Sequence, residues 1–338
     1  MSCETNSQVN GSDRSASRWL PTEDEVIEAT VRKIQLCRDT PSLPNLRGFR
    51  LDAPSDSSPP VWVKYTSQPE FLFTEMKTQQ YVHAEWMKAD EETKARLLVP
   101  EVFDYFEDEL DNGPWGSLTY GFIVMEYLPG ISIRNLIRPL RRDRVPESDE
   151  RITSLKDRVV EAVCFLLSLS PPPETAPGPV GGGRMKCRAF GTDDLEAPRQ
   201  FESSEDLQTY INDEIEQEGQ GLAPCDFLTE DLRLCCCDLG FHNFILQDES
   251  NPQTSKLIII DFEMTNWLPH SFLVWESWNT RDRHMSTGIR DRGQLEINED
   301  NIQAINGLRN RMDRIEHEYW VNRSREFWAK REGGHHKE

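Results

Sequence analysis

The chain has 338 residues, of which 37% are hydrophobic and 29% are charged. At about 100–200 residues per domain, this length predicts two cores or one two-lobed unit. Nowhere do about eighteen apolar residues follow one another, so no transmembrane helix is predicted. The net charge of −21 argues against binding to a nucleic-acid backbone as the main task. We therefore expect neither a membrane nor a nucleic acid as a partner.

The eight cysteines indicate a reducing environment. Residues 1–20 are rich in Ser and Asn and lack the apolar run of a secretory leader, so we expect a disordered tail there and a cytoplasmic protein. A second disordered tail is expected at residues 331–338. A zinc site from Cys225, the triplet 235–237 and His242 is an alternative, but its spacing fits no zinc-knuckle pattern. We expect these cysteines to be small buried hydrophobic residues.

The first predicted helix begins with the capping box Thr22-Glu23-Asp24-Glu25 and runs to about Cys37. The proline-rich residues 38–60 predict loops or weak edge strands. The β-branched and aromatic residues 61–65 predict a strand, and a helix follows over residues 70–88.

One carboxylate lies inside the apolar stripe of this second helix. Glu75 shares the stripe, and an unpaired charge on a core-facing surface is costly, so Glu75 needs a partner. Lys64 on the preceding strand is the expected partner, and the alternative places Glu75 in solvent at the edge of the stripe. The apolar members of the stripe are Leu72, Met76, Val82 and Trp86.

Two further strands are predicted at residues 99–106 and 120–125, with the acidic residues 107–113 as a solvated hairpin end. A small α/β unit is therefore expected to end near residue 128. The Pro- and Gly-rich residues 171–204 predict a long loop, which in a compact domain is usually functional or mobile. The rest of the chain is expected to be mainly helical. Helices are predicted at residues 134–144, 155–169, 201–218 and, as an amphipathic helix packed on the body of the protein, 302–319.

Residues 232–269 contain the pattern that indicates chemistry. Asp238 lies five residues before Asn243, a short apolar strand follows, and a second apolar strand ends at Asp261. Two strands joined by a turn would bring Asn243 and Asp261 to the same end of a hairpin. An amide oxygen and a carboxylate are hard ligands that suit Mg²⁺. Asp238 is then free to orient an attacking hydroxyl and accept its proton.

Six short motifs follow one another along the chain. They are V-x-V-K-Y at 61–65, T-E-M at 74–76, F-I-V-M-E-Y-L-P-G at 122–130, P-G-P-V-G-G-G at 177–183, D-L-x-x-x-N at 238–243 and I-I-D-F-E at 259–263. With these motifs in this order, the chain resembles the aminoglycoside phosphotransferase-like family, in particular its uncharacterised fungal branch. The resemblance spans about residues 61–278. It implies an α+β, protein-kinase-like, two-lobed fold, with a small β-sheet N-lobe carrying one helix (residues 21–128) and a mostly helical C-lobe (residues 129–330).

The resemblance also implies a role for each candidate residue. Lys64 would contact the α- and β-phosphates of ATP and be held by Glu75. The hinge formed by Met125, Glu126, Tyr127 and Leu128 would bind adenine through its backbone. Asp238 would be the catalytic aspartate, and Asn243 and Asp261 would be the Mg²⁺ ligands.

The chain departs from the family pattern at two places. Cys236 and Cys237 stand where members usually have His-Gly before the catalytic aspartate, and a thiol would brace that loop more weakly. No G-x-G-x-x-G occurs in residues 38–60. The segment after Asp261 is too short for the activation segment of a protein kinase, which favours a small-molecule acceptor.

The predicted function is an ATP- and Mg²⁺-dependent phosphotransferase acting on a hydroxyl group of a small molecule, in a setting such as fungal secondary metabolism. The acidic balance fits a cationic acceptor, and sugars or alcohols are equally allowed. The alternative is a catalytically silent or repurposed nucleotide-binding module on the same fold, because of the Cys236-Cys237 substitution. The oligomeric state is left open.

Overall fold

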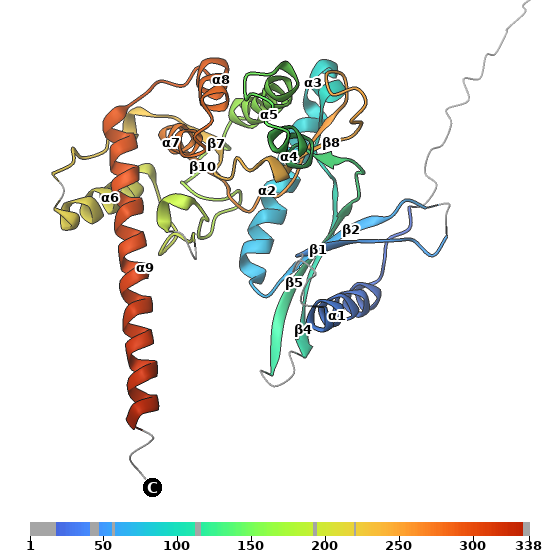
Figure 1. Ribbon diagram of the computed structural model, residues 1–338, viewed down its shortest axis with the longest axis horizontal. Helices are drawn as coiled ribbons and strands as arrows, with labels where there is room; N and C mark the ends of the chain where they lie inside the picture. Colours follow the sequence, from blue (N-terminus) through green and yellow to red (C-terminus); the bar gives the residue numbers. More distant parts are fainter. Residues whose placement is uncertain are drawn as a thin grey trace, which may run out of the picture.

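The computed structural model describes residues 18–40, 47–55, 58–111, 116–191, 195–219 and 221–333. Within these ranges the fold is a mixture of nine α-helices and three β-sheets (Figure 1). None of the helices in these ranges combines the length and apolarity needed to cross a bilayer. The expected terminal tails lie outside the described residues except at 18–20 and 331–333.

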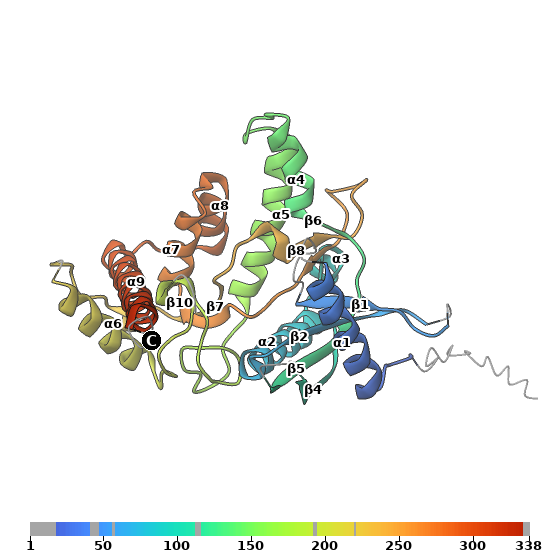
Figure 2. The same ribbon diagram turned by 60° about the horizontal axis from the view of Figure 1, so that its bottom comes forward.

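The first sheet is antiparallel and has the strand order β1-β2-β5-β4. Side chains on β2 alternate between the two faces, so Val61 and Val63 pack with Val26 of α1 on one face. On the other face, Leu72 and Met76 of α2 pack against β5 (Figure 2). The elements are β1 (Gly48–Leu51), β2 (Val61–Thr66), β4 (Val102–Asp111), β5 (Ser117–Glu126), α1 (Glu23–Asp39) and α2 (Pro69–Lys88).

Several predicted elements are confirmed here. The capping box forms, with Thr22 and Glu25 exchanging side-chain and backbone hydrogen bonds. The hairpin prediction is wrong in one respect, because residues 107–111 belong to β4 and pair with β5 instead of forming a turn. Glu107, Asp108, Glu109 and Asp111 are exposed, whereas Leu110 among them is buried in the apolar cluster that contains Val26 of α1. The predicted turn residues 112–113 lie outside the described residues.

A second sheet, with the strand order β3-β9-β8-β6, contains the hairpin that the sequence predicted around Asn243 and Asp261. Phe244 pairs with Ile259, and the amide of Ile260 donates to the carbonyl of Asn243 at 3.0 Å. The third sheet pairs β7 with β10. The strands are β3 (Leu97–Leu98), β6 (Ile131–Ser132), β7 (Leu232–Cys236), β8 (Phe244–Leu246), β9 (Leu257–Ile259) and β10 (Thr265–Pro269).

Helices dominate the remainder of the chain and enclose its largest apolar cluster. In its described residues, the long segment between α5 and α6 holds a single 3₁₀ turn, Arg188–Phe190, as expected for a loop. The helices are α3 (Glu91–Arg96), α4 (Ile133–Arg142), α5 (Glu150–Ser168), α6 (Ser204–Glu218), α7 (Ser271–Asn279), α8 (Arg283–Gly293) and α9 (Glu299–Gly333).

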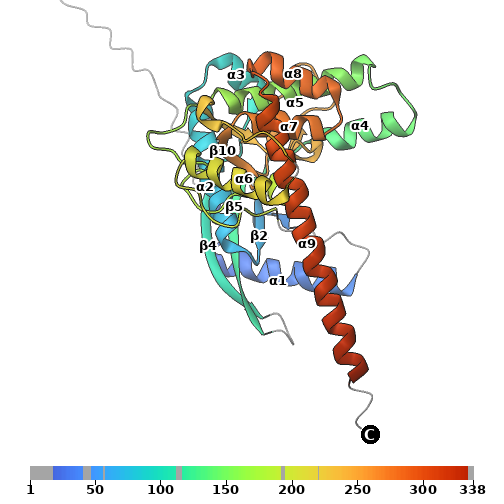
Figure 3. The same cartoon turned by 90° about the vertical axis from the view of Figure 1, so that its left-hand side faces the viewer.

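The C-terminal helix differs from its prediction. Its first turns pack through Ile302, Ile305 and Leu308, which are buried. Ile315 and Tyr319 are 45% and 53% exposed, because α9 continues past the body of the protein (Figures 1 and 3). The predicted packing of the whole helix is therefore correct only for its first half.

Candidate functional site

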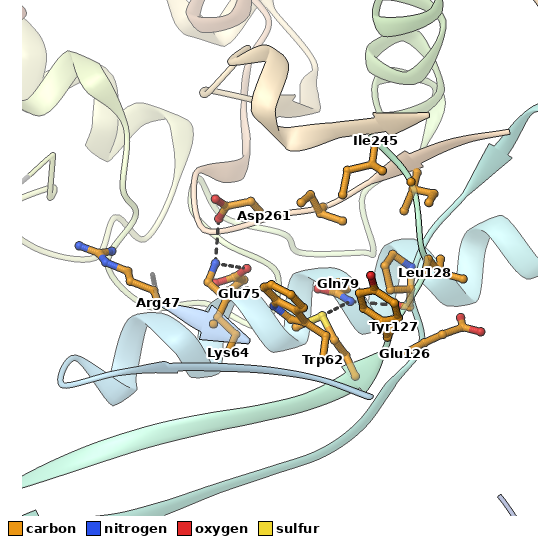
Figure 4. A pocket seen from close by; sticks show the side chains of 16 residues that line it. Arg47, Trp62, Lys64, Glu75, Gln79, Glu126, Tyr127, Leu128, Ile245 and Asp261 are labelled. Atoms are coloured by element: carbon orange, nitrogen blue, oxygen red, sulfur yellow. Dashed lines mark hydrogen bonds and ion pairs between the residues drawn. The ribbon is translucent and has the colours of Figure 1, made fainter. Parts of the chain in front are cut away.

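A cavity of about 380 Å³ lies between the first and second sheets (Figure 4). Trp62 and Lys64 of β2 form one wall, and Figure 4 shows Ile245 across the cavity from them. Ile258 and Ile260 also line the cavity. The chain from Met125 to Leu128 closes one end, whereas Lys64, Glu75 and Asp261 gather at the other. The cavity is therefore mostly apolar with a cluster of charges at one end, which is the usual character of a binding site for an organic ligand with an ionic group.

Lys64, Glu75 and Asp261 form the first charged cluster of the cavity, here called the Lys64 cluster. The Lys64 Nζ atom donates to Glu75 Oε1 at 2.7 Å and to Asp261 Oδ1 at 2.8 Å. Glu75 is buried, with 2% of its side chain exposed, so the alternative that places it in solvent is wrong. The structure forms the Lys64–Glu75 pair that the sequence predicted and adds Asp261 to it.

The electrostatics of this cluster follow from one cation between two carboxylates. Burial alone would lower the pKa of Lys64, but Asp261 and Glu75 outweigh it and raise that pKa. Burial would raise the pKa of Asp261, but the Lys64 ammonium holds it below its ordinary value. Burial, with the second carboxylate nearby, raises the pKa of Glu75 to about 7. Lys64 and Asp261 are thus fixed as charged groups at the edge of the cavity.

Asn243 and Asp261 lie at the same end of the β8–β9 hairpin, as predicted. Asp261 has a φ of 63°, a left-handed conformation that is uncommon for a residue other than glycine. The Asn243 Nδ2 atom donates to Asp238 Oδ2 at 3.1 Å and to the Asp238 carbonyl at 3.3 Å. These two acceptors fix the orientation of the amide. Asn243 Oδ1 is buried and receives no hydrogen bond from the described residues.

The unpaired oxygen of Asn243 shows that this end of the hairpin fits a hard cation. A buried amide oxygen without a donor is costly unless a ligand satisfies it. Asn243 Oδ1 and the Asp261 carboxylate are the oxygen donors that Mg²⁺ prefers, and Mg²⁺ needs few protein ligands because it retains water and phosphate oxygens. No group of three His, Cys, Asp or Glu residues in the described ranges forms a complete metal cage. The zinc alternative therefore has no support in these ranges.

Asp238 is held by groups from two segments, its own loop and the long loop that carries Arg188. Gly240 N donates to Asp238 Oδ1 at 3.1 Å, and Asn243 donates to Oδ2. Arg188, from the long loop, donates through Nη2 to Asp238 Oδ1 at 2.8 Å. Its Nη1 atom lies 3.3 Å from Glu276 Oε1. Arg188, Asp238 and Glu276 are here called the Asp238 cluster.

Sequence reasoning missed Arg188 and Glu276. Glu276 lies on α7 with 1% of its side chain exposed, and burial raises its pKa to about 8 although Arg188 opposes the shift. Only the carboxylate inside the apolar run of residues 271–278 could have drawn attention to Glu276. No sequence signal marks Arg188 among the arginines of the chain, since it lies in an irregular loop.

The cysteines before Asp238 are buried in and beside β7, as expected. The Cys236 Sγ atom donates to the carbonyl oxygen of Asp238 at 3.4 Å. Burial raises the pKa of the Cys236 thiol to about 12, so the thiol is neutral at physiological pH. Cys236 therefore holds the backbone of the loop and leaves the Asp238 carboxylate to other groups.

The predicted hinge, Met125 to Leu128, lines the cavity, and Trp62 was not predicted to join it. The Trp62 and Tyr127 rings are stacked, with centroids 6.2 Å apart and planes 16° apart. A Cβ atom at Gly48 would lie 2.8 Å from Trp62 Nε1, so glycine gives the indole its space. Glu126 directs its carboxylate toward Arg18, 3.9 Å away. The alternation of β2, which places Trp62 on the same face as Lys64, is the signal that could have identified it.

Comparisons with known proteins give little further information. A scan against protein-family models finds no match, and a search of curated proteins finds none either. Among solved structures, the chain is similar to the GDP and kanamycin complex of APH(2")-IIia, with 12% sequence identity and a TM-score of 0.42 over 82% of this chain and 87% of that chain. A similarity this distant carries no argument about function, so the site rests on its own geometry.

Proposed function

We propose that the protein is a Mg²⁺-dependent phosphotransferase that moves the γ-phosphoryl group of ATP to a hydroxyl group of a small molecule. The observation that carries the proposal is the Lys64 cluster, in which residues far apart in the sequence meet within 2.8 Å at the charged end of an apolar cavity. Asp238 and Asn243 lie on the loop before β8, and Asn243 lies at the same end of the β8–β9 hairpin as Asp261. This combination provides a cation for phosphates, oxygens for a metal ion and a carboxylate for an acceptor hydroxyl.

Each group has a distinct task in the proposed reaction. Lys64, kept charged by its two carboxylates, binds the phosphates of ATP. Asn243 Oδ1 and the Asp261 carboxylate would hold Mg²⁺, which supplies charge neutralisation for the phosphate oxygens. Asp238 orients the acceptor hydroxyl and takes its proton. The acceptor oxygen forms a bond to the γ-phosphorus, the bond from this phosphorus to the β–γ bridging oxygen breaks, and ADP leaves.

The base of the nucleotide has a complementary place in the apolar part of the cavity. The proposed hinge, Met125 to Leu128, would hydrogen-bond adenine through its backbone. Trp62 lies on the same wall as Lys64, and Ile245 lies across the cavity from it (Figure 4). An aromatic base between these walls would bury its two faces, and its triphosphate would extend toward Lys64.

The small-molecule acceptor is supported by the chain that follows Asp261. Only residues 262–264 separate Asp261 from β10, which pairs with β7 in the core. This leaves no room for a peptide-docking segment. We further propose a protein-kinase-like, two-lobed arrangement of aminoglycoside phosphotransferase-like type, with the lobes meeting near residue 128, and a cytoplasmic setting, which suits the free thiols of the seven described cysteines.

The test is the melting temperature of the protein with and without MgATP. A ligand at one hundred times its Kd stabilises a protein by about 2.7 kcal/mol, which gives a clear upward shift. The release of ADP is then measured with a panel of small hydroxyl compounds as acceptors. No shift with any Mg-nucleotide at millimolar concentration would overturn the proposal. A shift without ADP release would favour the silent or repurposed nucleotide-binding module instead.

A further inference from the structure

The turn that carries Arg188 is fixed from several sides. Ala189 and Phe190, which follow Arg188, are buried. The Nη1 atom of Arg309 on α9 donates to the carbonyl oxygens of Arg188 and Gly191. These contacts anchor the backbone of the turn, so the fold fixes the point from which the Arg188 side chain extends.

Glu276 fixes the guanidinium group itself. Glu276 is almost completely buried, neither of its oxygens receives a hydrogen bond within the described ranges, and Arg188 is the cation that forms an ion pair with it. A buried carboxyl group without a partner is unfavourable whether it is protonated or ionised, so the contact with Glu276 holds Arg188 inward. The same guanidinium group donates to Asp238 at 2.8 Å. Arg188 is thus held between one buried carboxylate and one carboxylate that faces the site.

We propose that Arg188 is a positioning residue for phosphoryl transfer, which locks the carboxylate of Asp238 in the orientation that receives the acceptor hydroxyl. This inference rests on the proposed function. Cys236, in front of the loop, contacts only the backbone oxygen of Asp238. The carboxylate accepts hydrogen bonds from Gly240, Asn243 and Arg188, and Arg188 is the one charged donor among these three. His242 Nε2 lies 3.7 Å from Asp238 Oδ2, beyond hydrogen-bond distance. An Arg–carboxylate contact is stronger and more directional than a neutral one, so its loss should release Asp238.

The experiment compares Arg188→Met with a matched control. Arg184 lies in the same loop with nearly the same exposure, 44% against 42%, and its partners Glu70 and Glu196 are remote from Asp238. Affinity for MgATP is measured by thermal shift, and ADP release is measured with water and with the best hydroxyl acceptor. We expect Arg188→Met to lower kcat about 10²-fold with the KM for MgATP unchanged, since small misplacements of a catalytic group have effects of this size. Arg184→Met should behave as wild type.

Two more variants separate positioning from stability. Arg188→Met leaves the buried carboxyl group of Glu276 without its partner and should lower the melting temperature. The double variant Arg188→Met/Glu276→Met removes that unpartnered polar group, so the melting temperature should recover while kcat stays low. Arg188→Lys, which can still donate to Asp238, should regain about tenfold of the lost turnover.

The outcomes are distinct. Turnover of Arg188→Met equal to or above that of wild type, a loss of MgATP affinity that matches the loss of turnover, or recovery of kcat in the double variant would each overturn the positioning role. Absence of MgATP binding, or of turnover, in the wild type would remove the proposed function and this inference with it. If the wild type is active and any of the first three results is obtained, the inference about Arg188 fails and the proposed function stands.

Discussion

The Lys64 cluster and the Asp238 cluster each consist of one cationic and two acidic side chains, but the two clusters are built differently. In each, one cation lies between a buried carboxylate and a carboxylate that faces the site, with Glu75 and Asp261 in the first and Glu276 and Asp238 in the second. In the Lys64 cluster both contacts are hydrogen bonds of 2.7–2.8 Å. In the Asp238 cluster one is a hydrogen bond of 2.8 Å and the other an ion pair at 3.3 Å.

The difference arises from the elements that carry the cations. Lys64 stands on β2, in the middle of a sheet, and 15% of its side chain is exposed. Arg188 stands on a 3₁₀ turn of a long loop, and 42% of its side chain is exposed. Strand β2 and helix α2 thus carry Lys64 and Glu75, in the part of the site proposed for the phosphoryl donor ATP. This part is the same whichever acceptor binds. The loop builds the part proposed for the acceptor, where proteins on one scaffold usually differ.

The largest expected effect is a division of labour between the two aspartates that face the site. Asp238→Asn should lower turnover by about 10² to 10⁴, the range for a lost general base, and leave MgATP affinity near that of wild type. Asp261→Asn should weaken MgATP binding by tenfold or more, because it removes a ligand of the proposed metal ion and a partner of Lys64. Titration with MgATP and ADP release in both variants provide the measurement.

Asparagine is a suitable replacement at both sites because it preserves the shape of the side chain and tolerates the left-handed backbone of Asp261. The same titration with ATP and no Mg²⁺ is the control. If both variants lose affinity equally, the two clusters do not divide binding from transfer, and the comparison drawn above fails.

A smaller effect is expected at Trp62, on the same strand as Lys64. Trp62→Leu should weaken MgATP binding about 10- to 30-fold, because stacking of a base on an aromatic ring contributes about 1–3 kcal/mol. Trp62→Phe retains a ring and should lose less. Mg-tripolyphosphate, which has no base, should bind all three proteins equally in a competition titration. Tighter MgATP binding by Trp62→Leu would instead identify the indole as an obstacle in the cavity.

The smallest effect concerns pH and the buried carboxylate of the Asp238 cluster. The pKa of Glu276 is about 8, against an ordinary value of 4.5, so the folded protein keeps a proton that the unfolded chain has already lost between these values. Its contribution to stability therefore falls as pH rises through this window. Glu276→Gln cannot titrate, and from pH 5.5 to pH 7 it should lose about 2 kcal/mol less stability than wild type.

Urea unfolding at both pH values measures this difference. Glu216→Gln, on the exposed face of α6, is the matched control and should follow the wild-type profile. Identical pH dependence in wild type and Glu276→Gln would contradict a raised pKa for Glu276 and, with it, the strong burial of this side of the site.

The sequence predicted the regular part of the molecule well, for physical reasons. An apolar stripe located α2, and β-branched and aromatic residues located β2. The two apolar strands before Asp261 predicted the hairpin that brings it to Asn243. The errors concern residues whose conformation or burial depends on contacts with other parts of the chain. The acidic residues 107–111 form a strand because β5 pairs with them, and α9 leaves the body of the protein although its apolar pattern continues.

The candidate site was predictable to the same extent. Spacing relative to strands and helices indicated that Lys64 lies near Glu75 and that Asn243 lies near Asp261. It did not indicate the contact between Lys64 and Asp261, which are 197 positions apart. Arg188 reaches Asp238 only through the path of a loop that no periodicity describes. Loops of this kind obtain their conformation from the surfaces they cross, which a single sequence does not reveal.

The contact between Arg309 and the Arg188 turn has a consequence for the order of folding. It joins residues 121 positions apart, and its donor belongs to the last helix of the chain. During synthesis, the strands and α2 that carry Lys64 and Glu75 leave the ribosome long before Arg309 exists. We therefore expect the Lys64 side to assemble early and the Arg188 turn to be fixed last, so that a nascent or C-terminally shortened chain can hold a folded sheet without yet having a working centre.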